Sequence, residues 1–189
     1  VFAFIGLLIA TSGITAMAAH QIAINTYDVL YMPLISIGSA MATRIGHAIG
    51  RQDMPGVKTC IEAGLMISVA LCVCITLVLV LVPDAIATIY TKQPDILLLA
   101  DKLLKMAALF VVVDMLMIIS SFSLRAFKDT RFPFMVTTVS YWMLALPLGY
   151  YLGLSDKSSE LHGPLGFWWG MIAGITLAAL LTCWRLLVF

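Results

Sequence analysis

The sequence is poor in charged residues. They make up 11% of its 189 positions, whereas a typical soluble domain carries about 25%. Hydrophobic residues make up 62%, and the mean hydropathy is +1.05. This composition excludes an ordinary soluble domain and indicates a polytopic α-helical membrane protein. It gives no support to nucleic-acid binding, and the net charge of +1 says nothing about partners until the charges are placed on the two sides of the membrane.

Cysteine is also scarce, and its placement argues against a disulfide framework. Cys72, Cys74 and Cys183 fall inside apolar runs, and Cys60 lies near the expected start of a helix. Cys72 and Cys74 are two residues apart, so on a helix they point to nearly opposite faces and would not share a metal ion. We interpret all four as small packing residues.

Several motifs are missing. The sequence has no P-loop, which argues against an ATP-driven pump, and no nucleophile–base pair or metal-ligand cluster, so we do not expect an enzyme. We expect no cofactor beyond a coupling ion. No basic stretch precedes the first apolar run, as a secretory signal would require. Because the sequence begins at Val1 rather than Met, already inside an apolar segment, we interpret the chain as part of a longer protein, with its first helix shortened.

Long apolar runs are what the sequence does have. Runs of this length without alternation predict membrane-spanning helices rather than strands, at about 20 residues per span. The expected architecture is all-α, a bundle of six transmembrane helices. The expected segments are 1–18, 22–45, 63–82, 96–124, 132–154 and 164–187.

The basic residues predict the orientation of the bundle. One set of segment ends carries most of the arginine, and the positive-inside rule places these ends in the cytoplasm, together with the C-terminus. The cytoplasmic set is Arg44, Arg51, Lys58, Arg125, Lys128, Arg131 and Arg185. The opposite set is Asp84, Lys92, Asp95, Asp156, Lys157 and Glu160. Between Arg125 and Arg131, we expect Asp129 to offset Lys128 or Arg131.

Asp114 is the most informative residue. No other charge lies between Lys105 and Arg125, and Asp114 is about 16 Å from Arg125 along a helix, near mid-membrane. A carboxylate at that depth costs at least about 2.5–3.5 kcal/mol and is usually functional. When ionised it attracts Na⁺ or an organic cation, and a proton that neutralises it lowers that affinity. The alternative is a protonated, hydrogen-bonded structural aspartic acid.

Asn25 and Asp28 are further candidates on the second segment. Asp28 is expected about one turn in from the outer side, either as an ordinary interfacial charge or as part of an outer vestibule that binds a second cation. Asn25 is expected either to line a cavity or to bond to a neighbouring helix. We place His20 and Gln21 at the outer turn between the first two segments. Trp168 is expected among the interfacial anchors, and Tyr141 is expected to pack or to line a cavity.

Four stretches resemble the NorM-like transporters of the MATE (multidrug and toxic compound extrusion) family. They occur in the family's order and with similar spacing, and the likeness covers essentially the whole chain. They are AAHQIAINTYDVLYMPLISIGSAMATRIGHAIGR at 18–51, SLRAFKDTRFPF at 123–134, SYWMLALPLGYYLGL at 140–154 and GPLGFWWGMIAGI at 163–175.

The resemblance implies that residues 1–189 form the C-terminal six-helix lobe of a twelve-helix transporter, with an N-terminal lobe as partner. It implies alternating-access antiport of organic cationic drugs and toxic compounds against Na⁺ or H⁺, in a bacterial inner membrane. Asp114 matches the acidic residue implicated in cation coupling, and so is the expected Na⁺ ligand. Relatives often have tyrosine where this chain has Phe110. A second acidic residue of the family would fall before Val1.

Two alternative functions stay open at this point. A lipid-linked oligosaccharide flippase of the same superfamily moves anionic headgroups, so its cavity needs several arginine or lysine side chains. A non-transporting membrane assembly subunit needs no water-accessible acid at mid-membrane. The central acid and the peripheral basic residues favour cationic cargo.

Overall fold

Helices form all the regular structure in residues 2–154 and 163–188, the part of the chain that the computed structural model describes. The elements, in chain order, are α1 Phe2–Ala10, α2 Ile14–Gly50, α3 Met54–Leu81, α4 Pro83–Tyr90, α5 Pro94–Ala126, α6 Arg131–Val139, the π-helical η1 Ser140–Ala145, α7 Leu146–Leu154 and α8 Pro164–Val188. The all-α prediction is confirmed. Three expected outer charges, Asp156, Lys157 and Glu160, lie outside the described residues.

Five helices in the described part are long and apolar enough to span a membrane: α2, α3, α5, the continuous α6–η1–α7 rod and α8. The first expected segment, 1–18, was predicted with the wrong extent. α1 ends at Ala10, and the chain turns at 11–13, where Gly13 has a φ of 111° that favours glycine. The helix that follows begins at Ile14, eight residues before its expected start. The short helix α4 was not predicted.

Local signals set the other helix boundaries. The Asp53 side chain caps α3, accepting a hydrogen bond from the Gly56 N–H at 2.9 Å. Pro83, Pro94 and Pro164 open α4, α5 and α8, where a missing N–H costs nothing. The limits predicted for the last four spans lie within a few residues of the observed helix ends, except at the start of α3.

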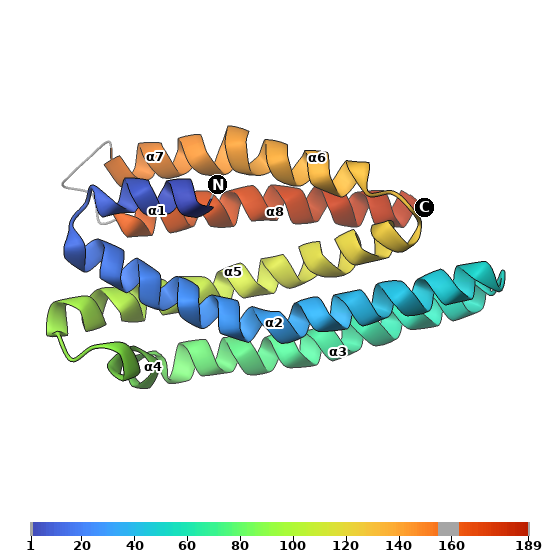
Figure 1. Ribbon diagram of the computed structural model, residues 1–189, viewed down its shortest axis with the longest axis horizontal. Helices are drawn as coiled ribbons and strands as arrows, with labels where there is room; N and C mark the ends of the chain where they lie inside the picture. Colours follow the sequence, from blue (N-terminus) through green and yellow to red (C-terminus); the bar gives the residue numbers. More distant parts are fainter. Residues whose placement is uncertain (1, 155–162, 189) are drawn as a thin grey trace.

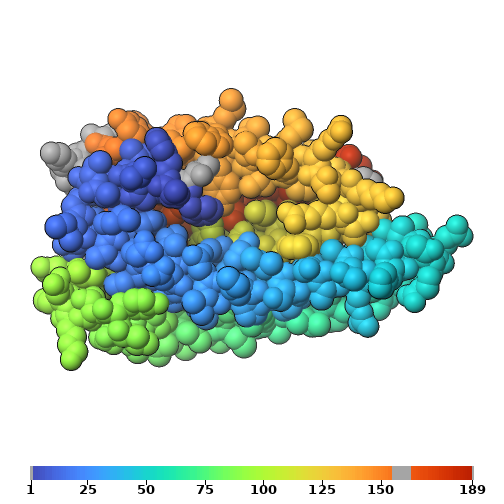
Figure 2. Space-filling view, in the orientation of Figure 1, coloured from blue at the N-terminus to red at the C-terminus, as the bar shows by residue number. Residues whose placement is uncertain are grey.

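α5 is the central helix of the bundle (Figure 1). It packs against α2, α3 and α8, and 61% of its most apolar stretch is buried, against 22% to 39% in the other four spans. On the face shown in Figure 2, the middle of α5 is visible only as a strip between α2 and the α6–η1–α7 rod. A polar group in the middle of α5, such as Asp114, is therefore held among neighbouring helices rather than on the outer surface.

The basic segment ends gather at one end of the bundle. The α2–α3 turn, the α5–α6 turn and the end of α8 lie on the same side in Figure 1, and α4 and the α1–α2 turn lie on the other. Large apolar side chains such as Met66, Val73 and Leu81 are exposed along α3. Such a surface is unsuited to water and suited to lipid or a partner within the membrane.

A seam of glycines joins α7 to α8. A Cβ built on Gly170 would lie 2.5 Å from the Ala145 carbonyl oxygen and from the Gly149 nitrogen. Gly166 meets the backbone of Gly153 equally closely, and Gly174 meets the Ala145 side chain. Small residues four apart let membrane helices approach to backbone contact. This contact fixes α8 against the rod that carries Tyr141.

Candidate functional site

Asp114 lies in the middle of the bundle and is only 2% exposed. The Tyr27 hydroxyl of α2 donates a hydrogen bond to its Oδ2 at 2.5 Å. Tyr31, one turn further along α2, stacks on the Tyr27 ring with centroids 5.0 Å apart. A buried carboxylate is costly unless it has such partners, and a hydroxyl donor stabilises the ionised form.

A cavity of about 350 Å³ adjoins the carboxylate, here called the Asp114 cavity. Its walls come from α1, α2, α5, α6 and η1, so it is bounded by elements far apart in sequence. The residues that line it are Phe2, Ile24, Tyr27, Asp28, Tyr31, Asp114, Met117, Thr137 and Tyr141. Two carboxylates and three tyrosines face it, but no lysine or arginine of the described residues does. A volume of this size suits a small ligand, and its charge favours a cation.

Asp28 lies deeper in the bundle than the sequence predicted. α2 starts at Ile14, so Asp28 is four turns into it, about 21 Å from its start, rather than one turn in. Asp28 is exposed and lines the Asp114 cavity beside Tyr27. The structure therefore brings the two candidate carboxylates, Asp28 and Asp114, to one cavity from two helices.

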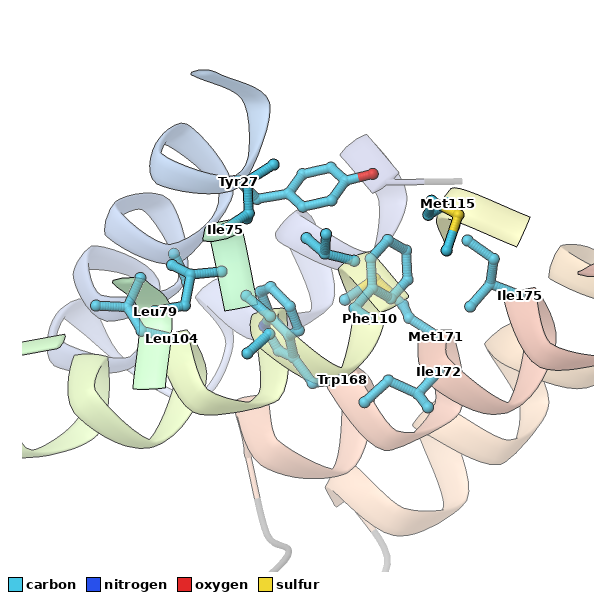
Figure 3. Packing of buried hydrophobic residues seen from close by; sticks show 14 of the residues in the cluster. Tyr27, Ile75, Leu79, Leu104, Phe110, Met115, Trp168, Met171, Ile172 and Ile175 are labelled. Carbon is cyan, nitrogen blue, oxygen red and sulfur yellow. The ribbon is translucent and has the colours of Figure 1, made fainter. Parts of the chain in front are cut away.

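Phe110 lies one turn before Asp114 on α5 and is 2% exposed. Its ring meets Tyr27 edge to face at 5.3 Å and approaches Trp168 of α8 at 6.2 Å. Figure 3 shows Phe110 to one side of these two rings, with Tyr27 above it and Trp168 below. Phe110 has no hydroxyl, but the Tyr27 hydroxyl from α2 reaches the carboxylate instead. Phe110 thus supports the tyrosine that contacts Asp114.

Asn25 is not brought to this cavity. It is exposed, and its Oδ1 accepts a hydrogen bond from Gln21 on the same helix at 2.9 Å. Asn25 does not line the Asp114 cavity, and its hydrogen bond to Gln21 lies within α2 rather than between helices. Its polar group is satisfied within α2.

His20 and Trp168 correct two expectations. His20 lies inside α2 and is 5% exposed, because the turn occurs at 11–13 rather than beside it. Trp168 is 1% exposed, and its Nε1–H donates to His20 Nδ1 at 3.2 Å. Trp168 is therefore a core residue that links α8 to α2, whereas its neighbour Trp169 is exposed, as an interfacial anchor would be.

Tyr141 lines the cavity from the π-helical turn η1. Such turns insert an extra residue and often occur at functional sites. Tyr141 is 7% exposed, and its ring contacts Phe2 at 5.5 Å. The expectation that it packs or lines a cavity is confirmed on both counts.

The α5–α6 turn also differs from expectation. Asp129 Oδ2 accepts from Arg185 Nε of α8 at 3.0 Å, whereas the sequence suggested Lys128 or Arg131 as partner. The Arg185 guanidinium also lies over the Phe132 ring, 5.4 Å from its centroid. The turn is thereby tied to the end of α8.

Tyr27 and Tyr31 are the site residues that sequence reasoning missed. The available signal was their spacing of four, which places two hydroxyls on one face of a membrane helix. Three or more histidine, cysteine or acidic side chains do not cluster anywhere in 2–154 or 163–188, so the described side chains form no multi-ligand metal centre. A cation at Asp114 would need other oxygen ligands, such as tyrosine hydroxyls, backbone carbonyls or water.

The comparisons with known proteins agree with this architecture. The family model described as MatE matches residues 1–151. The chain belongs to the MatE family. MatE proteins are membrane transporters and not enzymes. The predicted resemblance is therefore confirmed, and with it the multi-pass membrane character of the chain.

Individual relatives show how much of a MatE protein this chain spans. It is 37% identical to the multidrug resistance protein NorM of Photobacterium profundum and 37% identical to MdtK of Cronobacter sakazakii, each over 98% of its own length. It covers 41% and 40% of those two proteins. The eukaryotic MATE transporter AtDTX14 superposes with a TM-score of 0.87 over 98% of the chain and 42% of that structure, at 17% identity, and so shows the shared fold.

Proposed function

We propose that this chain is the C-terminal lobe of a cation-coupled antiporter that exports organic cations from a bacterial cell. The observation that carries the proposal is Asp114, a buried carboxylate at mid-membrane that opens on a cavity with a second acid and no basic residue. An unpaired negative charge in such a place is functional far more often than structural. The curated relatives NorM and MdtK are named multidrug resistance proteins, which supports the same function.

The proposed partner is an N-terminal lobe of the same protein. The chain spans about two fifths of its curated relatives, and six helices do not enclose a pathway by themselves. In the proposed cycle, an outward-facing cavity exposes Asp114, and Na⁺ or H⁺ binds there and displaces the drug. The lobes then rock, and the cavity opens to the cytoplasm to take up drug again.

Coupling requires that the two ligands compete or prefer different states, because a ligand that binds both states equally shifts neither. The coupling ion and the drug compete if both bind to the Asp114 carboxylate. Tyr27 would hold the carboxylate in place, and Asp28 would add negative charge to the same cavity. The charged side chains that line the cavity, among the described residues, are both acidic, which argues against an anionic lipid-linked headgroup as cargo.

The test is ethidium efflux by the full-length protein, with wild type compared with Asp114→Asn at matched expression. We expect the variant to lose efflux by more than about tenfold, the equivalent of about 1.4 kcal/mol of cation binding, while it remains folded and inserted. Asp84→Asn is the matched control, because Asp84 is exposed in α4 and distant from the cavity lining.

Normal efflux by Asp114→Asn would show that the carboxylate is structural and that the coupling group lies elsewhere. If efflux is lost, imposed sodium and pH gradients across proteoliposomes identify the coupling ion. A sodium gradient that drives efflux at constant pH indicates Na⁺, and a pH gradient that drives it without sodium indicates H⁺.

A further inference from the structure

A second cavity adjoins the Asp114 cavity and leads toward the basic end of the bundle. It has a volume of about 220 Å³, lies between α2, α5 and α6, and reaches Arg125; it is called the Arg125 cavity below. Tyr31, Met117 and Thr137 line both cavities. These three side chains therefore form a common wall, and Tyr31 and Thr137 are only half buried.

The two ends of this passage carry opposite charge. Asp114 and Asp28 face the first cavity, and Arg125 is the only charged residue within 2–154 and 163–188 that lines the second. Arg125 is exposed and, within 2–154 and 163–188, forms no salt bridge. Its guanidinium instead lies over the Phe122 ring, 4.9 Å from the centroid. The charge is thus held at the cavity mouth without a counter-ion to cancel it.

The walls around Arg125 strengthen its field. Met117, Ile118, Phe122, Pro133 and Phe134 supply mostly apolar surface, with a few hydroxyls from residues such as Ser121. Low-dielectric walls lined by one sign of charge focus the potential along a cleft. A guanidinium stays protonated at any physiological pH, so its repulsion of cations is permanent.

A coupling carboxylate must not be open to cations from both sides of the membrane at once, because the ion gradient would then leak away. We propose that the Asp114 cavity continues through the Arg125 cavity to the basic end of the bundle, and that Arg125 is a charge filter that keeps cations from reaching Asp114 by this route. A fixed positive charge at a pore constriction excludes cations in the same way. The inference rests on the proposed role of Asp114 as the carboxylate that takes up the coupling cation.

The test measures the local potential with thiol reagents in the full-length protein. Thr137→Cys, on the common wall, is introduced into a background that lacks the protein's other cysteines. The reporter is treated with anionic and cationic methanethiosulfonates of similar size. We expect the anionic reagent to react faster, and Arg125→Gln to lower the ratio of anionic to cationic rates by about tenfold, as a nearby unit charge in a partly dehydrated site would.

Arg131→Gln is the matched control, because Arg131 has the same charge, lies at the same end of the bundle and is not among the residues that line either cavity. It should leave the ratio within about twofold. Ser121→Cys provides a second reporter within the Arg125 cavity, one helical turn from Arg125 on α5. Reporters that do not react in folded protein, or equal effects of Arg125→Gln and Arg131→Gln, would overturn the proposal.

The thiol-labelling experiment and the efflux test can contradict their two proposals separately. The reaction ratio reports water access and local charge whether or not the protein transports. If Asp114→Asn pumps normally while the ratio of anionic to cationic reaction rates depends on Arg125, the passage and its charge exist, and the proposed coupling role of Asp114 is wrong. If Asp114→Asn is inactive but Arg125→Gln leaves the ratio of reaction rates unchanged, the antiport proposal is supported and the proposed charge filter is wrong.

Discussion

Helix packing is loose at the Asp114 cavity and close at the α7–α8 seam, although both lie within one bundle. Around Asp114, large aromatic side chains hold helices apart and leave about 350 Å³ unfilled. Along the seam, Gly166, Gly170 and Gly174 leave no room for even a methyl group. The rod of α6, η1 and α7 takes part in both, because Tyr141 lines the cavity and Ala145 touches Gly170 four residues later. Tight packing on one side of the rod thus fixes the open space on the other.

The largest effect is expected from breaking the seam. Gly170→Leu would place a side chain where a single Cβ already lies 2.5 Å from backbone atoms of Ala145 and Gly149. Backbone atoms of a helix do not give way as a flexible side chain does, so we expect a loss of about 3 kcal/mol or more in stability. Thermal denaturation in detergent, followed by the monodisperse fraction on size exclusion, measures it.

Gly46→Ala is the control for this substitution. Gly46 lies in α2, and a Cβ there meets nothing within 4 Å. Alanine is the better helix former by up to about 1 kcal/mol, so this change should be neutral or stabilising. If Gly170→Leu were as stable as Gly46→Ala, the seam would not be a close backbone contact, and the position of the rod would need another explanation.

The sequence predicted the bundle far better than the cavity. Apolar runs of about 20 residues and prolines at helix starts were enough to place the spans, and the one unpaired charge in such a run singled out Asp114. The α2 start was missed because its N-cap, Gly13, has no side chain that could cap the helix, and Thr11 and Ser12 before it were interpreted as part of a helix rather than as a turn. That error displaced every depth estimate on α2, which is why His20 was assigned to a turn and Asp28 to the interface.

The contacts around Asp114 were beyond sequence reasoning for a different reason. Tyr27 and Asp114 are 87 residues apart, and their hydrogen bond depends on how α2 crosses α5. Gly38 helps to set this crossing, because a Cβ there would lie 2.7 Å from the Phe122 ring. Trp168 was misassigned because nearness to a helix end does not tell whether a tryptophan faces lipid or core.

A smaller effect, confined to the cavity, is expected from Tyr27→Phe. The change removes the hydroxyl that donates to Asp114 Oδ2 and keeps the ring that contacts Phe110 and Tyr31. A charge-assisted hydrogen bond of this kind stabilises the ionised carboxylate by about 1.5 kcal/mol. For Na⁺, which needs the ionised form, we expect the concentration that gives half-maximal efflux to rise roughly tenfold, with little loss of folded protein. The measurement is the ion concentration that gives half-maximal efflux in proteoliposomes.

Combining Tyr27→Phe with Asp114→Asn isolates the pair. If the hydroxyl acts only through the carboxylate, the double variant should be no worse than Asp114→Asn alone. Tyr150→Phe is the control, since Tyr150 is exposed on α7 and does not line the cavity. Additive losses in the double variant would mean that Tyr27 contributes to transport independently of Asp114.

The smallest effect is expected where α8 ends, beyond the last seam glycine. There the helix is held by the Asp129–Arg185 ion pair, in which the aspartate side chain is 15% exposed and the arginine side chain 37%. A double-mutant cycle with Asp129→Asn and Arg185→Gln should give a coupling of at most about 1 kcal/mol, because water still reaches the arginine. The Lys58–Glu62 pair, at 3.8 Å with both side chains mostly exposed, should give a coupling near zero. A coupling at Asp129–Arg185 as large as the Gly170→Leu effect would mean that charge at the helix end, rather than the glycine seam, positions α8. The cavity would then depend on the basic end of the bundle for its shape.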